Sequence, residues 1–140
     1  METKDLLTII SPFASIILAG ITYYFAKQKD READRRKLKI DHYDELAKAM
    51  SKIVASKEAS SSIEARRRFM DACNTVLIIA SPKVVIALKM LFYEITKTEG
   101  RDKEKHDRLL TNLMIAIRED IGVTNDGFDA SFRFLLMSAE

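Results

Sequence analysis

The sequence contains no tryptophan, one cysteine, two prolines and four glycines among its 140 residues. One cysteine, Cys73, cannot form an intramolecular disulfide, so a disulfide scaffold and a cysteine-based zinc site are excluded, and a reducing compartment fits. Proline and glycine interrupt regular structure, so their scarcity favours long helices over short strands joined by turns. The sequence also lacks a glycine-rich phosphate-binding loop, which excludes the usual nucleotide-binding sites.

Groupings of catalytic side chains are missing as well. Cys73 falls on an apolar stripe without an adjacent base, and no nucleophile-elbow pattern is present. His42 has Asp41 and Glu45 beside it, but such a group holds a metal ion in a helical bundle when other helices supply matching ligands. No second segment offers glutamate and histidine three residues apart, so a solvated helix face is the simpler interpretation. We therefore predict a protein that is not an enzyme, with no metal, cofactor or small-molecule substrate.

The net charge of +2 conceals a local excess of basic residues. Residues 27–39 hold seven lysines and arginines against three acidic residues, whereas the rest of the chain is close to neutral. A protein that binds duplex nucleic acid spreads its positive charge over a face of the folded domain. The sequence therefore predicts no nucleic-acid partner.

A long apolar run, Leu6 to Ala26, carries no charged side chain. Its 21 residues would form a helix of about 30 Å, the thickness of the hydrocarbon core of a bilayer. A cleavable signal peptide fits less well, because the preceding flank is acidic and Tyr23-Tyr24-Phe25 stands where small residues would be expected. The run predicts a membrane anchor. Since basic residues accumulate on the cytoplasmic side of a span, we expect a single-pass inner-membrane protein with its N-terminus outside and its domain in the cytoplasm.

Two features of this region predict contacts. Ser11, Ser15 and Ala19 recur every four residues, so they fall on one stripe where another membrane helix could approach closely, although small residues are common in any span. Lys27, Lys29 and Arg31 follow the run at once and are expected to contact lipid headgroups. The predicted partners are therefore membrane lipid and either another protein or a second copy of the chain.

Beyond the basic segment, apolar residues recur at steps of three and four, the spacing of one helix face. The first such helix is expected from Ile40 to about Glu58, and Ser60-Ser61-Ser62 predicts a break before the second. Ser81-Pro82 predicts the start of a third, because proline suits the first helical position. The stripes of the four predicted helices include Tyr43, Leu46, Met50 and Ile53; Ile63, Phe69, Met70, Cys73, Val76 and Leu77; Val84, Leu88, Leu91 and Ile95; and Leu109, Leu110, Leu113 and Ile117.

The C-terminal part of the sequence contains a stop signal and an apolar tail. Gly122 is placed to adopt the left-handed conformation that ends a helix. In the tail, residues 124–140, the spacing of Phe128, Phe132, Leu135 and Leu136 predicts a short closing helix. The tail either packs on the bundle or docks on another protein, and packing is favoured because each large apolar side chain left in water costs about 1.5–3 kcal/mol.

Two charged clusters suggest an ion-paired or recognition surface. Arg66-Arg67-Arg68 interrupts the second helix, and Arg118-Glu119-Asp120 lies at the end of the fourth. Arg118 suits the negative end of a helix dipole, whereas Glu119 and Asp120 do not, so these carboxylates are expected to have basic partners. The arginines on the second helix are candidates. A structural salt bridge and a recognition surface both remain open.

The predicted fold is all-α. A transmembrane helix continues into a long amphipathic helix, which packs in an antiparallel bundle of about four helices. The domains are an N-terminal tail and anchor (residues 1–26), a charged juxtamembrane stalk (27–39) and a cytoplasmic helical bundle (40–140).

Three stretches make this chain similar to uncharacterised bacterial and phage single-pass membrane proteins with a charged helical stalk and a small cytoplasmic helical domain. They are residues 65–69, 78–84 and 113–122. The resemblance implies a helical bundle on a membrane tether and carries over no catalytic residue. The predicted function is a membrane-tethered interaction module, acting as an adaptor or assembly factor. The alternative is a membrane-active effector or inhibitor of phage or plasmid type that acts through assembly of its transmembrane helix.

Overall fold

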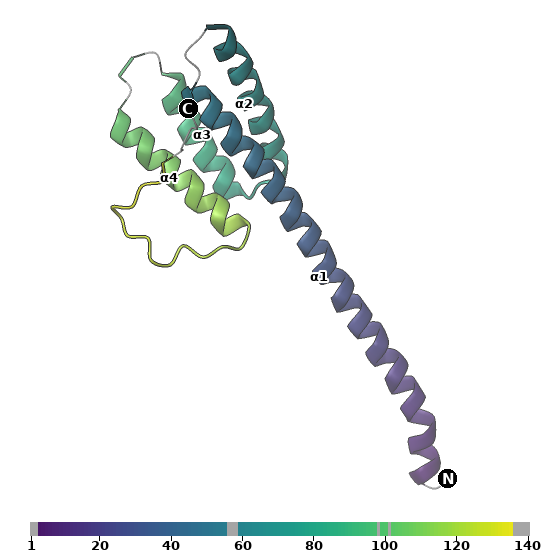
Figure 1. Ribbon diagram of the computed structural model, residues 1–140. Helices are drawn as coiled ribbons and strands as arrows, with labels where there is room; N and C mark the ends of the chain where they lie inside the picture. The colour runs from purple at the N-terminus through teal and green to yellow at the C-terminus, as the bar shows by residue number, and fades with distance from the viewer. Residues whose placement is uncertain (1–2, 56–58, 98, 101, 136–140) are drawn as a thin grey trace. The chain divides into compact units, whose positions relative to one another are not determined.

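The computed structural model describes residues 3–55, 59–97, 99–100 and 102–135, with the side chains of residues 3–13, 54–55 and 59–62 left out. Its helices are α1 (Thr3–Ala55), α2 (Ala59–Ile79), α3 (Pro82–Thr96) and α4 (Lys103–Asp120) (Figure 1). No strand occurs in the described ranges. The prediction of an all-α fold with four helices packed in a bundle is confirmed.

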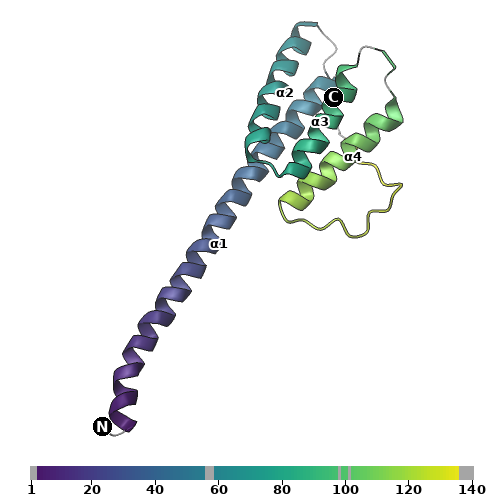
Figure 2. The same cartoon turned by 180° about the vertical axis from the view of Figure 1, so that it is seen from behind.

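The chain divides into two compact units, Met1–Lys37 and Leu38–Glu140. The first unit contains the N-terminal part of α1. The second contains the rest of α1 together with α2, α3 and α4, and these four segments form the helical bundle (Figure 2).

The membrane span predicted for the N-terminal part of α1 is not found. In the part of the chain that the structure describes, no helix is both long enough and apolar enough to cross a membrane. The described apolar side chains run from Ala14 to Ala26, about 20 Å of helix, before charged residues begin at Lys27. The first eight residues of the predicted anchor, 6–13, have no described side chains. Because no helix among the described residues could cross a membrane, the predicted single-pass location in the inner membrane, with the N-terminus outside and the domain cytoplasmic, is wrong.

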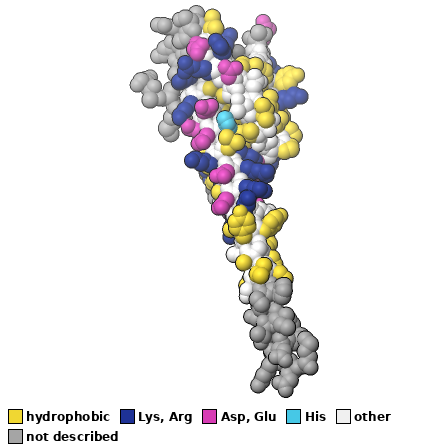
Figure 3. All heavy atoms as spheres, turned by 90° about the vertical axis from the view of Figure 1, so that its right-hand side faces the viewer, with side chains coloured by type: hydrophobic (Ala, Val, Ile, Leu, Met, Phe, Trp, Pro, Cys, Tyr) yellow, Lys and Arg dark blue, Asp and Glu magenta, His cyan; other side chains and the backbone are white. Residues whose placement is uncertain are grey.

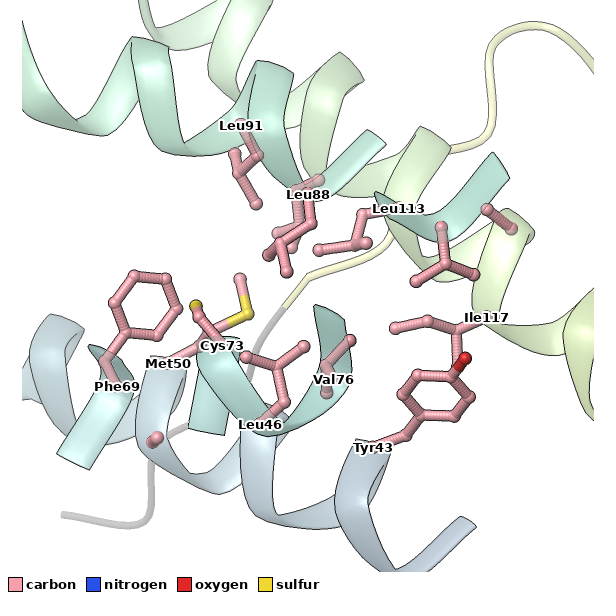
Figure 4. Close-up of a cluster of buried hydrophobic side chains, with 14 of the residues drawn as sticks. Tyr43, Leu46, Met50, Phe69, Cys73, Val76, Leu88, Leu91, Leu113 and Ile117 are labelled. Atoms are coloured by element: carbon pink, nitrogen blue, oxygen red, sulfur yellow. The ribbon is translucent and has the colours of Figure 1, made fainter. Parts of the chain in front are cut away.

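The core of the bundle is a layer of apolar side chains contributed by all four helices (Figure 4). Each predicted stripe supplies members of it, because positions three and four residues apart share one face of a helix. The fully buried side chains with the largest volumes are Leu46, Leu91, Leu113, Val76 and Val84. Phe69 of α2 and Phe92 of α3 stack with their ring centroids 6.5 Å apart, which fixes the contact between these two helices.

The helix starts follow local chemistry, with one exception. Pro82 occupies the first turn of α3 as predicted, with Ser81 in an extended conformation before it. Asp102 caps α4, since its carboxylate accepts hydrogen bonds from the N–H groups of Glu104 and Lys105. The predicted break at Ser60-Ser61-Ser62 is wrong, because these residues lie within α2. Serine is tolerated inside a helix, so three serines alone did not mark a boundary.

The end of α4 is a Schellman motif built around Gly122. This glycine has a φ of 77°, as predicted, and the N–H groups of Gly122 and Val123 donate to the carbonyls of Glu119 and Arg118. These two bonds satisfy carbonyl groups that have no partner within the helix. The chain then reverses direction and returns along α4 (Figure 1).

The returning tail is not the closing helix that the sequence predicts. Its described residues, 121–135, form turns and irregular backbone. The N–H of Phe134 donates to Thr111 Oγ1 on α4, and the carbonyl of Ala130 accepts from the Arg133 guanidinium. In a helix the N–H of Phe134 would donate to the carbonyl of Ala130, four residues earlier. The two observed bonds take the place of that helical hydrogen bond. The tail does contact α4, which agrees with the expectation that it packs on the bundle.

Candidate interaction surface

Helix α3 is apolar on two opposite sides. Its core side is formed by Val84, Leu88 and Leu91, and the residue two positions after each of these is also apolar and exposed. Two residues correspond to a rotation of about 200° around a helix, so this second set lies on the back of α3. Its members are Ile86, Met90 and Tyr93, with 60%, 54% and 66% of their surface exposed.

Helix α2 adds apolar side chains on one flank. Met70 and Leu77 each follow a core residue by one position, which places them about 100° from the core side. Arg68 and Thr75 each precede a core residue and lie on the opposite flank. That opposite flank faces α1, because side chains of both helices line one groove: Glu45, Lys48, Ala49, Lys52, Arg68, Asp71, Ala72 and Thr75. Met70 and Leu77 therefore lie on the side of α2 that faces α3.

We refer to these exposed apolar side chains of the two helices together as the α2–α3 face. Its exposed apolar members are Ile63, Met70, Leu77, Ile86, Met90 and Tyr93. Figure 3 looks onto the side of the bundle where Figure 1 draws α2, and it shows hydrophobic side chains at the surface together with basic and acidic ones. A large exposed apolar patch on a folded domain typically marks an interaction site.

The arginines predicted as a functional cluster belong partly to this face. Arg66 follows the core residue Ala65, so it shares the flank of Met70, and Arg67 lies further outward. Arg68 is on the other flank, where its Nε lies 2.9 Å from Glu64 Oε1. The three consecutive arginines therefore do not act as one cluster, because successive residues on a helix point in different directions.

Asp120 has partners other than the predicted arginines. Its carboxylate accepts from Lys39 Nζ at 2.9 Å, from the Tyr43 hydroxyl and from the backbone N–H of Ser81. Burial by itself raises the pKa of Asp120, but the bonds from Tyr43 and Lys39 outweigh it and hold that pKa below its ordinary value. The pKa of Tyr43 is raised, chiefly by burial and also by its hydrogen bond to Asp120. Asp120 thus joins α1, the start of α3 and the end of α4.

The other two residues of the predicted C-terminal cluster are also used within the bundle. Glu119 pairs with Lys83 at the surface. Arg118 holds the tail: its guanidinium donates to Asn125 Oδ1 and to the Thr124 carbonyl, both at 2.9 Å, and lies 5.3 Å from the centroid of the Phe128 ring. Of the two interpretations kept open for these residues, the contacts favour the structural one.

A second buried carboxylate, which the sequence did not single out, lies at the other end of α3. Glu94 is 3% exposed, and Lys97 Nζ and Lys105 Nζ lie 3.0 Å and 3.2 Å from its Oε2. The backbone N–H of Asp102 also donates to it. The bond from Lys97, followed by the other donors, lowers the pKa of Glu94 to about 2 despite the opposing effect of burial. Glu94 therefore fixes the connection between α3 and α4.

These two carboxylates predict that the bundle loses stability in acid. Each has a folded-state pKa below its ordinary value, so the stability it contributes is complete above that ordinary value and is lost as the pH falls toward the folded-state pKa. For Glu94 the window runs from 4.5 down to about 2. Urea denaturation followed by circular dichroism should show the free energy of unfolding falling through this window, with a shallower fall in Glu94→Gln. Equal slopes in both proteins would contradict the assignment.

The N-terminal residues singled out from the sequence lie in the first unit. Ser15 and Ala19 are on the exposed surface of α1, and the side chain of Ser11 lies outside the described residues. Lys27 Nζ lies 5.7 Å from the centroid of the Tyr23 ring, and Lys29 and Arg31 are exposed. The roles predicted for these residues in helix packing and headgroup contact stay predictions.

The structure bears on two kinds of reactive group considered in the sequence, the cysteine thiol and a metal site. Cys73 is buried, and its burial raises the pKa of the thiol to about 11, so the thiolate nucleophile does not form near neutral pH. Among the described residues, no group of three or more histidine, cysteine, aspartate or glutamate side chains is arranged to hold a metal ion.

Comparisons with known proteins add no assignment. No protein-family model matches the sequence, and comparisons with curated proteins and with solved structures find no significant match. The resemblance to bacterial and phage membrane proteins therefore stays a hypothesis, and function is inferred from the side chains of this chain.

Proposed function

We propose that this protein is a helical interaction module, an adaptor or assembly factor that binds another protein through the α2–α3 face. The observation that carries the proposal is that α3 is apolar on its back as well as on its core side, with Ile86, Met90 and Tyr93 more than half exposed. A helix that only covers a core presents polar side chains to water on its outer side. An apolar back indicates that a second surface covers it.

The free energy available supports this role. Fully burying one large apolar side chain contributes about 1.5–3 kcal/mol, so covering three or four of those on the α2–α3 face provides a substantial part of a micromolar binding energy of about 8 kcal/mol. Tyr93 and Met90 are also of residue types enriched at the centres of protein interfaces. The role proposed is non-catalytic.

A site-specific photo-crosslinker tests the proposal. We expect the crosslinking residue at position 90, on the back of α3, to give a discrete adduct with one protein in cells, because the partner covers that position. The same residue at position 48 of α1 is the matched control, since the Lys48 side chain is also open to solvent but lies outside the α2–α3 face.

The adduct supports the proposal if it also disappears when Ile86→Glu is added, one turn away on the same stripe. That substitution is at an exposed position, so the melting temperature should change little. Equal labelling at positions 48 and 90, or labelling at position 90 that survives Ile86→Glu, would overturn it.

A further inference from the structure

We infer that the occupant of the α2–α3 face is an amphipathic helix whose apolar stripe is flanked by acidic side chains. This inference rests on the proposed function and specifies the chemistry of the partner. Its basis is the charge of the face, which carries one sign.

The cations on and beside the α2–α3 face outnumber its anions. Arg66 and Arg67 extend from α2, and Lys89 extends from α3 on the side that carries Phe92, next to α2. In the described part of the chain none of these three lies within ion-pair distance of a carboxylate, although Arg67 is close enough to Glu64 to help lower its pKa. Lys83 and Lys97, at the two ends of α3, are paired with Glu119 and Glu94. Unpaired cations around an apolar surface favour a partner that brings carboxylates.

The acidic residues of α2 and α3 are turned away from this face. Glu94 is buried on the side of α3 that meets α4, where Lys105 reaches it. Asp71 lines the groove between α1 and α2, and Glu64 pairs with Arg68 on that same flank of α2. Of these carboxylates, only Glu64 interacts with a cation of the face, Arg67, so the α2–α3 face keeps an excess of positive charge.

The apolar positions fit a helix better than an extended segment. Ile86, Met90 and Tyr93 are spaced four and three residues apart, and on α2 Ile63, Met70 and Leu77 are spaced by seven. Each set forms a straight stripe along its helix, and the stripe on α2 is about 21 Å long. A partner helix of about 14 residues, with apolar side chains at the same spacing, would cover it.

A second copy of this chain fits the face poorly. In a two-fold symmetric contact the same patch meets itself, so Arg66, Arg67 and Lys89 of one chain would approach the same three residues of the other. Like charges brought together at an interface are unfavourable, and the described part of this face offers no unpaired acid to offset them.

Peptide binding to the 140-residue chain tests the inference. The probes are two labelled helical peptides of about 18 residues with the same leucine stripe, one flanked by glutamates and the other by lysines. In fluorescence anisotropy at about 0.05 M salt, the acidic peptide should bind at least about tenfold more tightly, and the difference should shrink at about 0.5 M salt because screening weakens charge pairing.

Substitutions on the face make the test specific. Arg66→Glu, Arg67→Glu and Lys89→Glu together should reverse the preference, so that the basic peptide binds more tightly. Lys48→Glu and Lys52→Glu on α1 are the matched control and should leave the preference unchanged. Tyr93→Ser should weaken both peptides, because it removes apolar contact and no charge.

The outcomes separate this inference from the proposed function. If both peptides bind equally and Tyr93→Ser weakens both, the face is a docking site but the acidic partner is overturned. If neither peptide binds while the crosslink at position 90 stands, the acidic helix is again overturned and the proposed function survives.

Two further outcomes would assign the face to another occupant. Self-association in sedimentation velocity that Met90→Glu abolishes would assign it to a second copy, and peptide displacement by anionic phosphatidylglycerol vesicles would assign it to a lipid surface. Either result overturns the inference.

Discussion

Replacing Leu113 with alanine should lower the free energy of unfolding by about 2–5 kcal/mol. Leu113 lies at the centre of α4 and is 0% exposed, within the core cluster formed by all four helices. Truncation removes apolar contacts and leaves a cavity that the surrounding helices fill only in part. The expected loss is a large fraction of the stability of a domain of this size.

Urea denaturation followed by circular dichroism measures this loss, and Ile86→Ala is the control. Ile86 is apolar and helical as well, but it is exposed on the back of α3, so its truncation should change stability by less than about 0.5 kcal/mol. A similar loss in the two variants would contradict the assignment of core and surface. It would show that Ile86 is covered in the free protein.

Replacing Asp120 with alanine should cost about 2–4 kcal/mol. The substitution leaves the Tyr43 hydroxyl without its acceptor at a largely buried position and leaves Lys39 without its carboxylate. Asp120→Asn should cost less, because the amide oxygen still accepts one hydrogen bond while the negative charge is lost.

Glu119→Ala is the matched control for the Asp120 variants. The neighbouring Glu119 pairs with Lys83 where both side chains are solvated, and exposed ion pairs contribute about 0–1 kcal/mol. Thermal and urea unfolding should therefore rank the three variants with Asp120→Ala least stable and Glu119→Ala closest to the unchanged protein. Equal destabilisation by Asp120→Ala and Glu119→Ala would show that the contacts of Asp120 do not join the helices as described.

Local sequence signals predicted the fold where they act on the backbone directly. Pro82 and Gly122 mark a helix start and a helix end because proline lacks an N–H and glycine tolerates positive φ, and both effects are independent of the rest of the protein. The periodic apolar stripes predicted the core for the same reason. The prediction of a closing helix in the tail is wrong because Phe134 and Ala130 take hydrogen-bond partners that the sequence pattern does not reveal.

The candidate interaction surface was harder to predict, because apolar identity does not distinguish a core from an interface. Met70 and Leu77 fall next to Phe69 and Val76 in the sequence, so the spacing places them in the same predicted stripe, although they are exposed. The sequence of α3 does contain a signal of the second surface. An apolar residue follows each core residue by two positions, which gives this helix a second apolar stripe opposite the first. The same reasoning failed for Asp120, since the sequence reveals an unfavourably placed carboxylate but not which of many basic residues approaches it.

The contacts of Asp120 also determine the order in which this chain can finish folding. Its partners Lys39 and Tyr43 precede it by 81 and 77 residues, so α1 cannot form these bonds until more than three quarters of the chain has been synthesised. Partly folded chains that expose the apolar side of α1 are prone to aggregate. A chain that ends before residue 120 therefore lacks the contacts that join the end of α4 to α1.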